Sequence, residues 1–346
     1  MRLHLQGIRI ARKLAALIVL ALSWNTNAFA QQENDPFSDA RSLLRQGKNA
    51  EAIARLKALA ARRPETRGVN RELGIAYYRE REYLQSVEYL QKAWKENPED
   101  RDAVQLLGLS YYSVGKPAEA IPVLETVRSW HPDASIDAIY ILGLCYVLTK
   151  RYPEARQTFA QLYGVSADSA AAHLLLGRML LRQGFDPAAE REIKAALSVS
   201  PRMPLAHLAL GELGVYGGNY PGAVQEFNAE LVLNPACALA LTHLGEVYWR
   251  LNRDEESQRV LRRSISLDSM ASEPYAVLGK VLLRERQPAL AEKHLLHAIH
   301  LDPSSYSAHY FLGQLYRYQG RVEAAEREMK AAARIQQLQT SNSGRN

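Results

Sequence analysis

The stretch Leu73-Gly74-Ile75-Ala76-Tyr77 sets the organisation of this 346-residue chain, because it returns one repeat later as Leu107-Gly108-Leu109-Ser110-Tyr111. Leu-Gly pairs occur eight times, at a nearly constant spacing of about 34 residues. Their glycines are Gly74, Gly108, Gly143, Gly177, Gly211, Gly245, Gly279 and Gly313. A spacing held over eight copies indicates a repeat architecture, in which each copy is one supersecondary unit stacked on its neighbours.

Three further positions recur with the glycines. The third residue after the glycine is Tyr in five copies: Tyr77, Tyr111, Tyr146, Tyr248 and Tyr316. Twelve residues after the glycine stands a small side chain, namely Ser86, Ala120, Ala155, Ala189, Ala223, Ser257, Ala291 and Ala325. Four residues later stands a large apolar one, namely Leu90, Leu124, Phe159, Ile193, Phe227, Leu261, Leu295 and Met329.

These spacings predict two helices in each copy. Leu, Gly and Tyr share one face of a first helix, and the small and large residues share one face of a second. Small side chains let the two helix axes approach, and large ones fill the remaining gap. Several copies close with a proline, such as Pro98 or Pro235, where a helix cannot continue. Each copy is therefore predicted to be a helical hairpin.

This pattern closely resembles the tetratricopeptide repeat, whose Leu-Gly, Tyr, Ala, Phe and Pro positions span about 34 residues. The resemblance covers about residues 35–338, with a weaker ninth copy at the start, where Ala40 takes the place of the glycine. It implies an all-α fold, a right-handed superhelical solenoid of about nine hairpins. The array is expected over 37–339, in units of about 33–66, 67–100, 101–135, 136–169, 170–203, 204–237, 238–271, 272–305 and 306–339. A short linker at 31–36 precedes it, and a disordered tail at 340–346 follows.

One copy departs from the tyrosine pattern, because Gly214 stands at that position and is followed by Gly217 and Gly218. Glycine weakens helices, so this first helix is expected to be the least well packed. Cys145 and Cys237 lie more than two copies apart, too far for a disulfide, and are expected to be buried and unpaired.

Residues 1–30 are typical of a secretory signal. A basic segment precedes the apolar run from Leu14 to Leu22, and small residues at Ala28 and Ala30 mark a cleavage site. The resemblance is therefore to an exported, bacterial type of repeat protein, periplasmic or secreted, with no membrane span after cleavage. Retention of the segment as an anchor is the alternative, although nine apolar residues fall short of the roughly 20 that span a bilayer as a helix.

Charge and motifs argue against several function classes. The net charge of +6 includes four basic residues in the first 30, and the remainder holds 39 basic and 37 acidic residues. Nucleic-acid binding requires a larger basic surplus gathered on one face. No phosphate-binding loop, His-Glu-x-x-His or Cys-x-x-Cys motif occurs. We therefore expect no nucleic-acid partner, no enzymatic activity and no cofactor.

Histidines offer one metal candidate, formed by His294, His297 and His300. Only the first two lie one helical turn apart, whereas a closed site needs three or four converging ligands. A solvated outer helix is the simpler interpretation, and no metal site is predicted. Three other histidines each precede a repeat glycine by four residues and are expected to fill the hairpins: His173, His207 and His309.

The resemblance also implies a binding surface, because first helices line the inside of such a solenoid. Positions three before and one, four and five after each glycine face away from the packing residues. The candidate partner-binding residues at these positions are Arg71, Tyr78, Arg79, Tyr112, Tyr140, Arg178, Arg182, Tyr216, Trp249, Arg250, Lys280, Arg284, Tyr310, Arg317 and Tyr318. Eight are basic, whereas the same positions hold two acids, Glu212 and Glu246.

Tyr, Trp and Arg are the residue types enriched in binding hot spots. The surface would suit a protein or peptide with acidic and apolar groups. The alternative is that the aromatic residues pack between hairpins while the arginines are merely solvated. The sequence thus favours a non-catalytic protein-protein interaction scaffold in the periplasm or cell envelope, which binds a segment in a concave groove. An accessory or regulatory subunit of an envelope enzyme, or of a polysaccharide, pilus or secretion assembly, is the second candidate.

Overall fold

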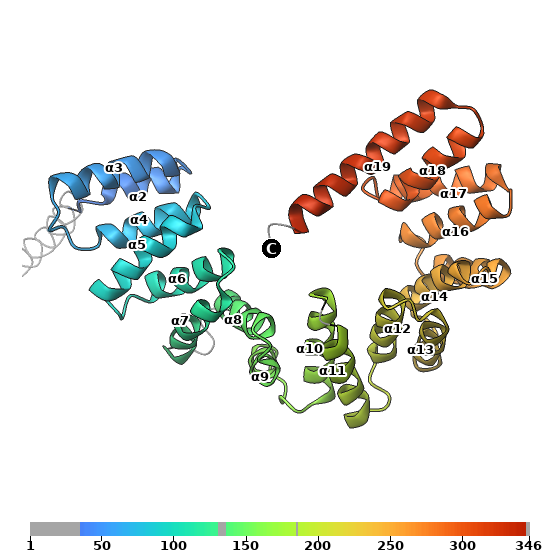
Figure 1. Cartoon of the computed structure of the whole chain (residues 1–346), viewed down its shortest axis with the longest axis horizontal. Coiled ribbons are helices and arrows are strands. Elements are labelled where there is room, and N and C mark those ends of the chain that lie inside the picture. Colours follow the sequence, from blue (N-terminus) through green and yellow to red (C-terminus); the bar gives the residue numbers. More distant parts are fainter. Residues whose placement is uncertain (1–34, 131–135, 185, 344–346) are drawn as a thin grey trace, which may run out of the picture. The chain divides into compact units, whose positions relative to one another are not determined.

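The computed structural model describes residues 35–130, 136–184 and 186–343. Within these ranges the chain forms eighteen helices and no strand (Figure 1). In chain order the helices alternate as the first and second helix of nine copies, and we call the two helices of one copy a pair: α2 (Ser38–Arg45) and α3 (Asn49–Arg62), α4 (Val69–Arg79) and α5 (Tyr83–Glu96), α6 (Arg101–Ser113) and α7 (Pro117–Trp130), α8 (Ile136–Leu148) and α9 (Tyr152–Leu162), α10 (Ala170–Arg182) and α11 (Asp186–Val199), α12 (Ala206–Tyr216) and α13 (Tyr220–Leu233), α14 (Ala238–Arg250) and α15 (Asp254–Leu267), α16 (Glu273–Arg284) and α17 (Pro288–Leu301), α18 (Tyr306–Tyr318) and α19 (Val322–Ser343). The all-α repeat fold is thereby confirmed.

The last helix is longer than the sequence predicts. It continues to Ser343, whereas a disordered tail was expected from residue 340. The Thr340 hydroxyl donates a hydrogen bond of 3.1 Å to the Gln336 carbonyl, so this polar residue is accommodated within the helix. At the other end of the chain, the expected signal segment, residues 1–30, lies outside the described residues.

The chain divides into two compact units, Met1–Thr149 and Lys150–Asn346. The boundary falls in the turn between α8 and α9, inside the predicted unit 136–169. The sequence pattern carries no signal for this division, because the repeat continues through it. Each unit has its own series of packed first helices.

Seven of the repeat glycines, Gly74, Gly108, Gly177, Gly211, Gly245, Gly279 and Gly313, lie where the two helices of a pair meet. A Cβ placed on Gly108 would lie 2.4 Å from Leu124 Cδ2, and one on Gly211 would lie 2.4 Å from the Phe227 ring. In each case the neighbour is the large residue sixteen positions later. The predicted interlock of glycine with a large apolar side chain is therefore confirmed at these positions.

The turns within the pairs share one backbone feature. The seventh residue after each of the eight glycines has a φ between 58° and 75°, in the left-handed region. These residues are Arg81, Gly115, Lys150, Gly184, Gly218, Asn252, Arg286 and Gly320. Glycine adopts this conformation without steric cost, but four of the eight turns use other residues.

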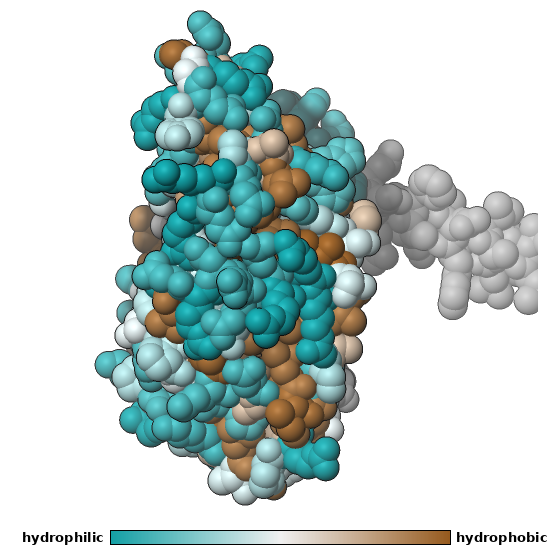
Figure 2. Space-filling model, turned by 90° about the vertical axis from the view of Figure 1, so that its right-hand side faces the viewer, coloured by the Kyte–Doolittle hydropathy of each residue, from teal (hydrophilic) through white to brown (hydrophobic). Residues whose placement is uncertain are grey.

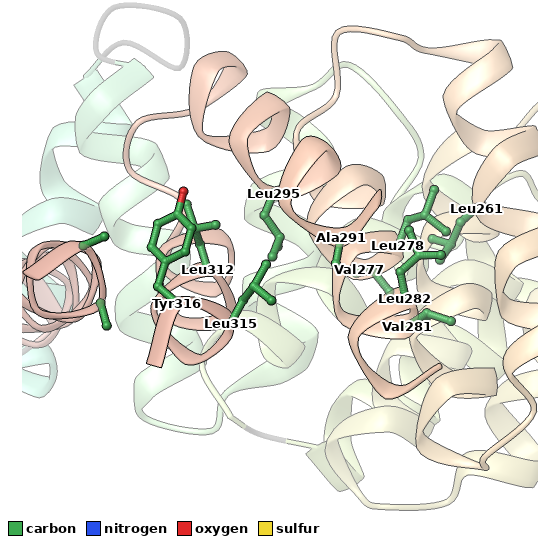
Figure 3. Packing of buried hydrophobic residues seen from close by; sticks show 12 residues of the cluster. Leu261, Val277, Leu278, Val281, Leu282, Ala291, Leu295, Leu312, Leu315 and Tyr316 are labelled. Atoms are coloured by element: carbon green, nitrogen blue, oxygen red, sulfur yellow. The ribbon is translucent and has the colours of Figure 1, made fainter. Parts of the chain in front are cut away.

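Buried apolar side chains fill the space between successive pairs. Figure 3 shows Leu295 of α17 directed toward Leu315 of α18, in a cluster that also includes Leu261, Val277 and Tyr316. Hydrophilic residues cover most of the face seen in Figure 2, and hydrophobic residues appear there as separate patches. Both cysteines are buried and unpaired, as predicted.

Two serines occupy positions where most copies have alanine, and both are buried. The Ser86 hydroxyl donates to the Gly74 carbonyl at 3.0 Å, and the Ser257 hydroxyl donates to the Gly245 carbonyl at 2.7 Å. A buried hydroxyl without a partner would be costly, so these bonds allow serine to occupy this buried position.

The three repeat histidines pack inside their hairpins, and each also bonds to a glutamate of the second helix. The Nδ1 atoms of His173, His207 and His309 lie 2.7, 2.7 and 2.6 Å from a glutamate of the second helix. Their partners, each nineteen residues later, are Glu192, Glu226 and Glu328. This constant spacing was present in the sequence and could have revealed these pairs.

Candidate functional site

The candidate partner-binding residues lie on first helices that contact one another within each unit. In the first unit α4 contacts α6 and α6 contacts α8; in the second, α10, α12, α14, α16 and α18 each contact the next. We call the residues of the first unit the first stripe: Arg71, Tyr78, Arg79, Tyr112 and Tyr140. Those of the second unit form the second stripe: Arg178, Arg182, Tyr216, Trp249, Arg250, Lys280, Arg284, Tyr310, Arg317 and Tyr318.

The tyrosines of the first stripe are half-buried. Tyr78 meets Tyr83 edge to face, with ring centroids 5.6 Å apart. Burial raises the pKa of both Tyr78 and Tyr112, so these phenols stay neutral at physiological pH. Tyr140 is also half-buried. The first stripe therefore offers phenol rings that are partly accessible and partly fixed by packing.

The cations of the first stripe have partners within the chain. Arg71 forms ion pairs with Asp100 at 2.7 Å, Glu72 at 2.9 Å and Asp102 at 3.0 Å. Arg79 donates a hydrogen bond of 3.0 Å to the Leu44 carbonyl. Carboxylates therefore balance the charge of Arg71, whereas the exposed Arg79 is held by a neutral carbonyl.

The second stripe centres on Trp249 of α14. The Lys280 Nζ of α16 lies 3.7 Å from the centroid of the Trp249 ring, and the Arg284 guanidinium carbon lies 4.9 Å from it. Lys280 also approaches the Phe311 ring at 5.4 Å. Among the described residues no acceptor meets the buried indole N–H of Trp249. We call Trp249, Lys280, Arg284 and Glu246 the tryptophan cluster.

Carboxylates hold the cations of this cluster. Glu246 Oε1 lies 2.9 Å from Lys280 Nζ and 3.0 Å from Arg250 Nη2. Lys280 is almost fully buried, and burial lowers its pKa although the Glu246 charge acts in the opposite direction. Arg284 pairs with Asp254 and donates a hydrogen bond of 2.7 Å to the Trp249 carbonyl. These contacts fix α14 against α16.

The remaining residues of the second stripe are more open. Arg178, Arg182 and Arg317 are exposed, and in the part of the chain that is described none of them has an ion-pair partner. Tyr216 is 73% exposed and Tyr318 is 85% exposed. Tyr310, by contrast, is half-buried and stacks on Tyr306 with ring centroids 5.7 Å apart.

The structure thus corrects the expected charge balance of eight bases against two acids. Of the eight, Arg71, Arg250, Lys280 and Arg284 pair with carboxylates. Four of the pairing acids, Glu72, Asp100, Asp102 and Asp254, were missed because they do not lie at the four repeat offsets; the three aspartates lie at or near helix starts.

The histidines of α17 pack against an aromatic ring. His297 meets Tyr275 with ring centroids 4.5 Å apart, and His294 lies 6.0 Å from the same ring. Across residues 35–130, 136–184 and 186–343, no three His, Cys, Asp or Glu side chains are grouped as metal ligands would be. None of the helices described there is long and apolar enough to cross a membrane.

Models of the tetratricopeptide repeat match most of the chain. One matches residues 77–140 and 111–179, and a second matches residues 38–104, 174–232, 208–269 and 277–339. No curated protein sequence matches the chain.

Several solved structures align with the chain at low identity. The crystal structure of the anaphase-promoting complex hetero-tetramer Cut9-Hcn1 aligns with a TM-score of 0.44 and 17% identity, covering 82% of this chain and 56% of that one. The chain thus spans little more than half of that relative. PilF of Pseudomonas aeruginosa aligns with a TM-score of 0.46 and 17% identity, covering 60% and 97% of the two chains. YrrB, described as having an unusual peptide-binding site, aligns with a TM-score of 0.41 and 21% identity over 53% and 93%.

Proposed function

Because the chain belongs to the tetratricopeptide repeat family, generally a non-catalytic protein-interaction fold, we propose that it is a scaffold that binds a peptide or protein segment. The proposed binding surface is the second stripe, on the contacting first helices of the second unit. The proposal includes the absence of an enzymatic activity of its own.

The tryptophan cluster is the observation that carries this proposal. Trp249 is only partly buried, is fixed by cations from the neighbouring first helix, and has an indole N–H without an acceptor among the described residues. Because the indole nitrogen is itself buried, a partner would contact the partly exposed face of the ring rather than the N–H. A rigid, partly accessible aromatic side chain surrounded by charge has the features of a binding hot spot.

The flanking residues define the chemistry of the partner. Arg178, Arg182 and Arg317 supply positive charge that no described carboxylate neutralises. The exposed Tyr216 and Tyr318 supply ring area at low entropic cost. We therefore propose a partner segment with apolar side chains that meet the rings and carboxylates that meet the free arginines.

We further propose that the protein works outside the cytoplasm, in the periplasm or cell envelope or as a secreted protein. The N-terminal basic segment, the apolar run and the small residues before Gln31 support this location. N-terminal sequencing of the protein isolated from the exported fraction tests it. A mature chain that begins at Gln31 supports cleavage, and a retained Met1 indicates an anchor instead.

Site-specific photo-crosslinking tests the proposed surface. A photoreactive phenylalanine replaces Tyr216 or Tyr318 in the full chain, in intact cells. The matched control replaces Val232 of the second helix α13, which is 79% exposed. We expect one partner to be crosslinked from positions 216 and 318 and not from 232. Equal crosslinking from all three positions would contradict the proposed surface.

The identity of the crosslinked protein separates two roles. A structural component of an envelope assembly would indicate a scaffold. An enzyme whose activity changes when this protein is added would indicate the accessory or regulatory subunit that is the second candidate.

A further inference from the structure

The residue three positions after each repeat glycine places its side chain in a buried slot between neighbouring helix pairs. Seven of the eight residues there are at most 9% exposed. They are Tyr77, Tyr111, Tyr146, Leu180, Tyr248, Leu282 and Tyr316. The eighth is Gly214, which has no side chain to place in the slot.

The tyrosine side chains in these slots contact the second helix of the preceding pair. Tyr111 hydrogen-bonds Gln91 of α5, and the Tyr146 hydroxyl donates to Glu125 of α7. Lys57 of α3 precedes Tyr77 by 20 residues, as Gln91 precedes Tyr111. The Lys57 Nζ lies 5.5 Å from the centroid of the Tyr77 ring. A polar side chain of the preceding second helix therefore meets the phenol in three slots.

In α17 the polar side chain near the slot tyrosine comes from a position one helical turn earlier. The Glu292 carboxylate, which pairs with Arg321 at 2.7 Å, also acts on the Tyr316 phenol, whose pKa is raised by burial and by this carboxylate. Glu292 lies four residues before the position equivalent to Gln91. The chain itself thus provides two templates for recognising a tyrosine from the preceding second helix, represented by Gln91 with Tyr111 and by Glu292 with Tyr316.

The slot at Gly214 is open and carries both recognition groups. A cavity of about 440 Å³ lies between α11 and the α12–α13 pair, and its lining includes Leu210, Leu213, Gly214, Glu190 and Lys194. Lys194 precedes Gly214 by 20 residues, as Gln91 precedes Tyr111. Glu190 precedes Gly214 by 24 residues, as Glu292 precedes Tyr316. The side chains of Glu190 and Lys194 pair with each other at 2.6 Å.

The cavity means that none of the described side chains fills this slot. Leu213 is half-buried, like Met179 of the preceding pair, whereas Val247, Val281 and Leu315, the residues at the same position in the three following pairs, are at most 1% exposed. A half-buried leucine beside a cavity provides an apolar wall for a ring. Glu190 and Lys194 provide an acceptor and a donor for a phenol hydroxyl.

We propose that the cavity between α11 and α12 is a receptor for a tyrosine side chain of a partner protein. The ring packs against Leu210 and Leu213, and the hydroxyl donates to Glu190 and accepts from Lys194. The partner thus supplies the side chain that Gly214 omits. None of these lining residues belongs to the first or second stripe, so this site is additional to the proposed binding surface.

Titration of the full chain with the peptide acetyl-Gly-Gly-Tyr-Gly-Gly-amide tests the proposal, with Phe and Ala versions as references. Backbone amide NMR signals of Gly214 and Gly217 report on the slot. We expect saturable shifts with the Tyr peptide, about threefold to tenfold weaker binding of the Phe peptide, as for the loss of one or two hydrogen bonds, and no shifts with the Ala peptide. Equal responses to all three peptides, or none to the Tyr peptide, would overturn the proposal.

Variants separate recognition from folding. Glu190→Gln with Lys194→Met should remove the preference for Tyr over Phe, whereas Glu88→Gln with Lys92→Met, a matched exposed pair at 2.7 Å on α5, should preserve it. Gly214→Tyr should fill the slot and abolish binding. Gly214→Ala is its control, because any Cβ there lies 3.2 Å from Ala223 Cβ.

One further variant tests whether the chain supplies its own ring. Phe185 is next to Asp186 in sequence and is not among the described residues. If only Phe185→Ala binds the Tyr peptide, the slot is filled from within the chain and the proposal of a partner tyrosine is wrong. Equal binding by wild type and Phe185→Ala supports it.

Discussion

Lys280 and Trp249 come from different helix pairs, yet the ammonium nitrogen of Lys280 lies 3.7 Å from the centroid of the Trp249 ring. The same ammonium lies 2.9 Å from Glu246. The buried Lys280 of α16 therefore contacts both the Trp249 ring and the Glu246 carboxylate of α14. Desolvated cation–π contacts contribute about 2 kcal/mol or more. The contact therefore contributes to stability between pairs as well as to the shape of the proposed binding surface.

The buried Lys280 should make stability depend on alkaline pH. Its pKa is lowered in the folded chain, mainly by burial, while the unfolded chain keeps the ordinary value near 10.5. Between the folded and unfolded pKa values the unfolded state binds more protons, so the free energy of unfolding rises with pH. Urea unfolding should therefore show that wild type gains stability relative to Lys280→Met between neutral pH and about pH 10.5.

The comparison with Lys280→Met cancels the titration of groups that both proteins share. If the difference in unfolding free energy stays constant or falls as pH rises, the ammonium is stabilised in the folded chain at least as well as in water. The account of Lys280 as a desolvated cation would then be wrong.

Two repeat glycines should respond differently to alanine. In Gly211→Ala the new Cβ would lie 2.4 Å from the rigid Phe227 ring, whereas in Gly313→Ala it would lie 3.1 Å from Cγ of the flexible Met329. Overpacking of a rigid neighbour costs about 1–3 kcal/mol. We expect Gly211→Ala to be the less stable variant by at least about 1 kcal/mol, measured by chemical unfolding with hydrogen exchange at each pair. Equal losses would show that Phe227 can move as readily as Met329.

The two thiols should be unreactive in the folded protein. Cys145 is fully buried, and burial raises its pKa to about 12, so the reactive thiolate is scarce at pH 8. Cys237 is also buried. A thiol reagent should modify neither residue under native conditions and both after unfolding, as counted by mass spectrometry. Rapid native modification of Cys145 would mean that α8 opens locally.

The arginines of the second stripe should separate into two classes. Arg178→Ala with Arg182→Ala should leave stability within about 0.5 kcal/mol of wild type, because neither side chain has a described ion-pair partner. The same variant should weaken partner binding and reduce its salt dependence. Arg284→Ala should instead lower stability, because it breaks the contacts with Asp254, Asn252 and the Trp249 carbonyl.

Thermal unfolding and binding at two salt concentrations distinguish these classes. Loss of stability in the Arg178/Arg182 variant, or an unchanged salt slope for binding, would contradict the assignment of free charge to these positions.

The regular part of the fold was readable from the sequence because its physical cause is local and repeated. Gly211 and Phe227 are sixteen residues apart, and that spacing alone predicts their contact. The split of the chain at Thr149 and the helical conformation of residues 340–343 were not predicted. Both depend on details of packing and helix continuation that the repeat offsets do not encode. The handedness of the solenoid stays a prediction.

The candidate site was only partly readable, for a related reason. The offsets placed Trp249 and Lys280 on one face, but the acid that pairs with Arg284, Asp254, lies at the start of a second helix. Pairing between a first helix and the turn of a neighbouring copy depends on three-dimensional proximity. Charge counts along one set of offsets therefore overestimated the free positive charge.

The affinity of the partner crosslinked at Tyr216, measured by calorimetry with wild type and two tryptophan variants, tests the central claim most directly. Trp249→Ala removes the partly buried ring of the tryptophan cluster, whereas Trp94→Ala removes a comparably half-buried ring from the second helix α5. We expect Trp249→Ala to weaken binding by about 2 kcal/mol or more and Trp94→Ala to leave it within error, both variants remaining folded. Unchanged affinity of folded Trp249→Ala, or equal losses in both variants, would show that the first-helix face of the second unit is not where the partner binds.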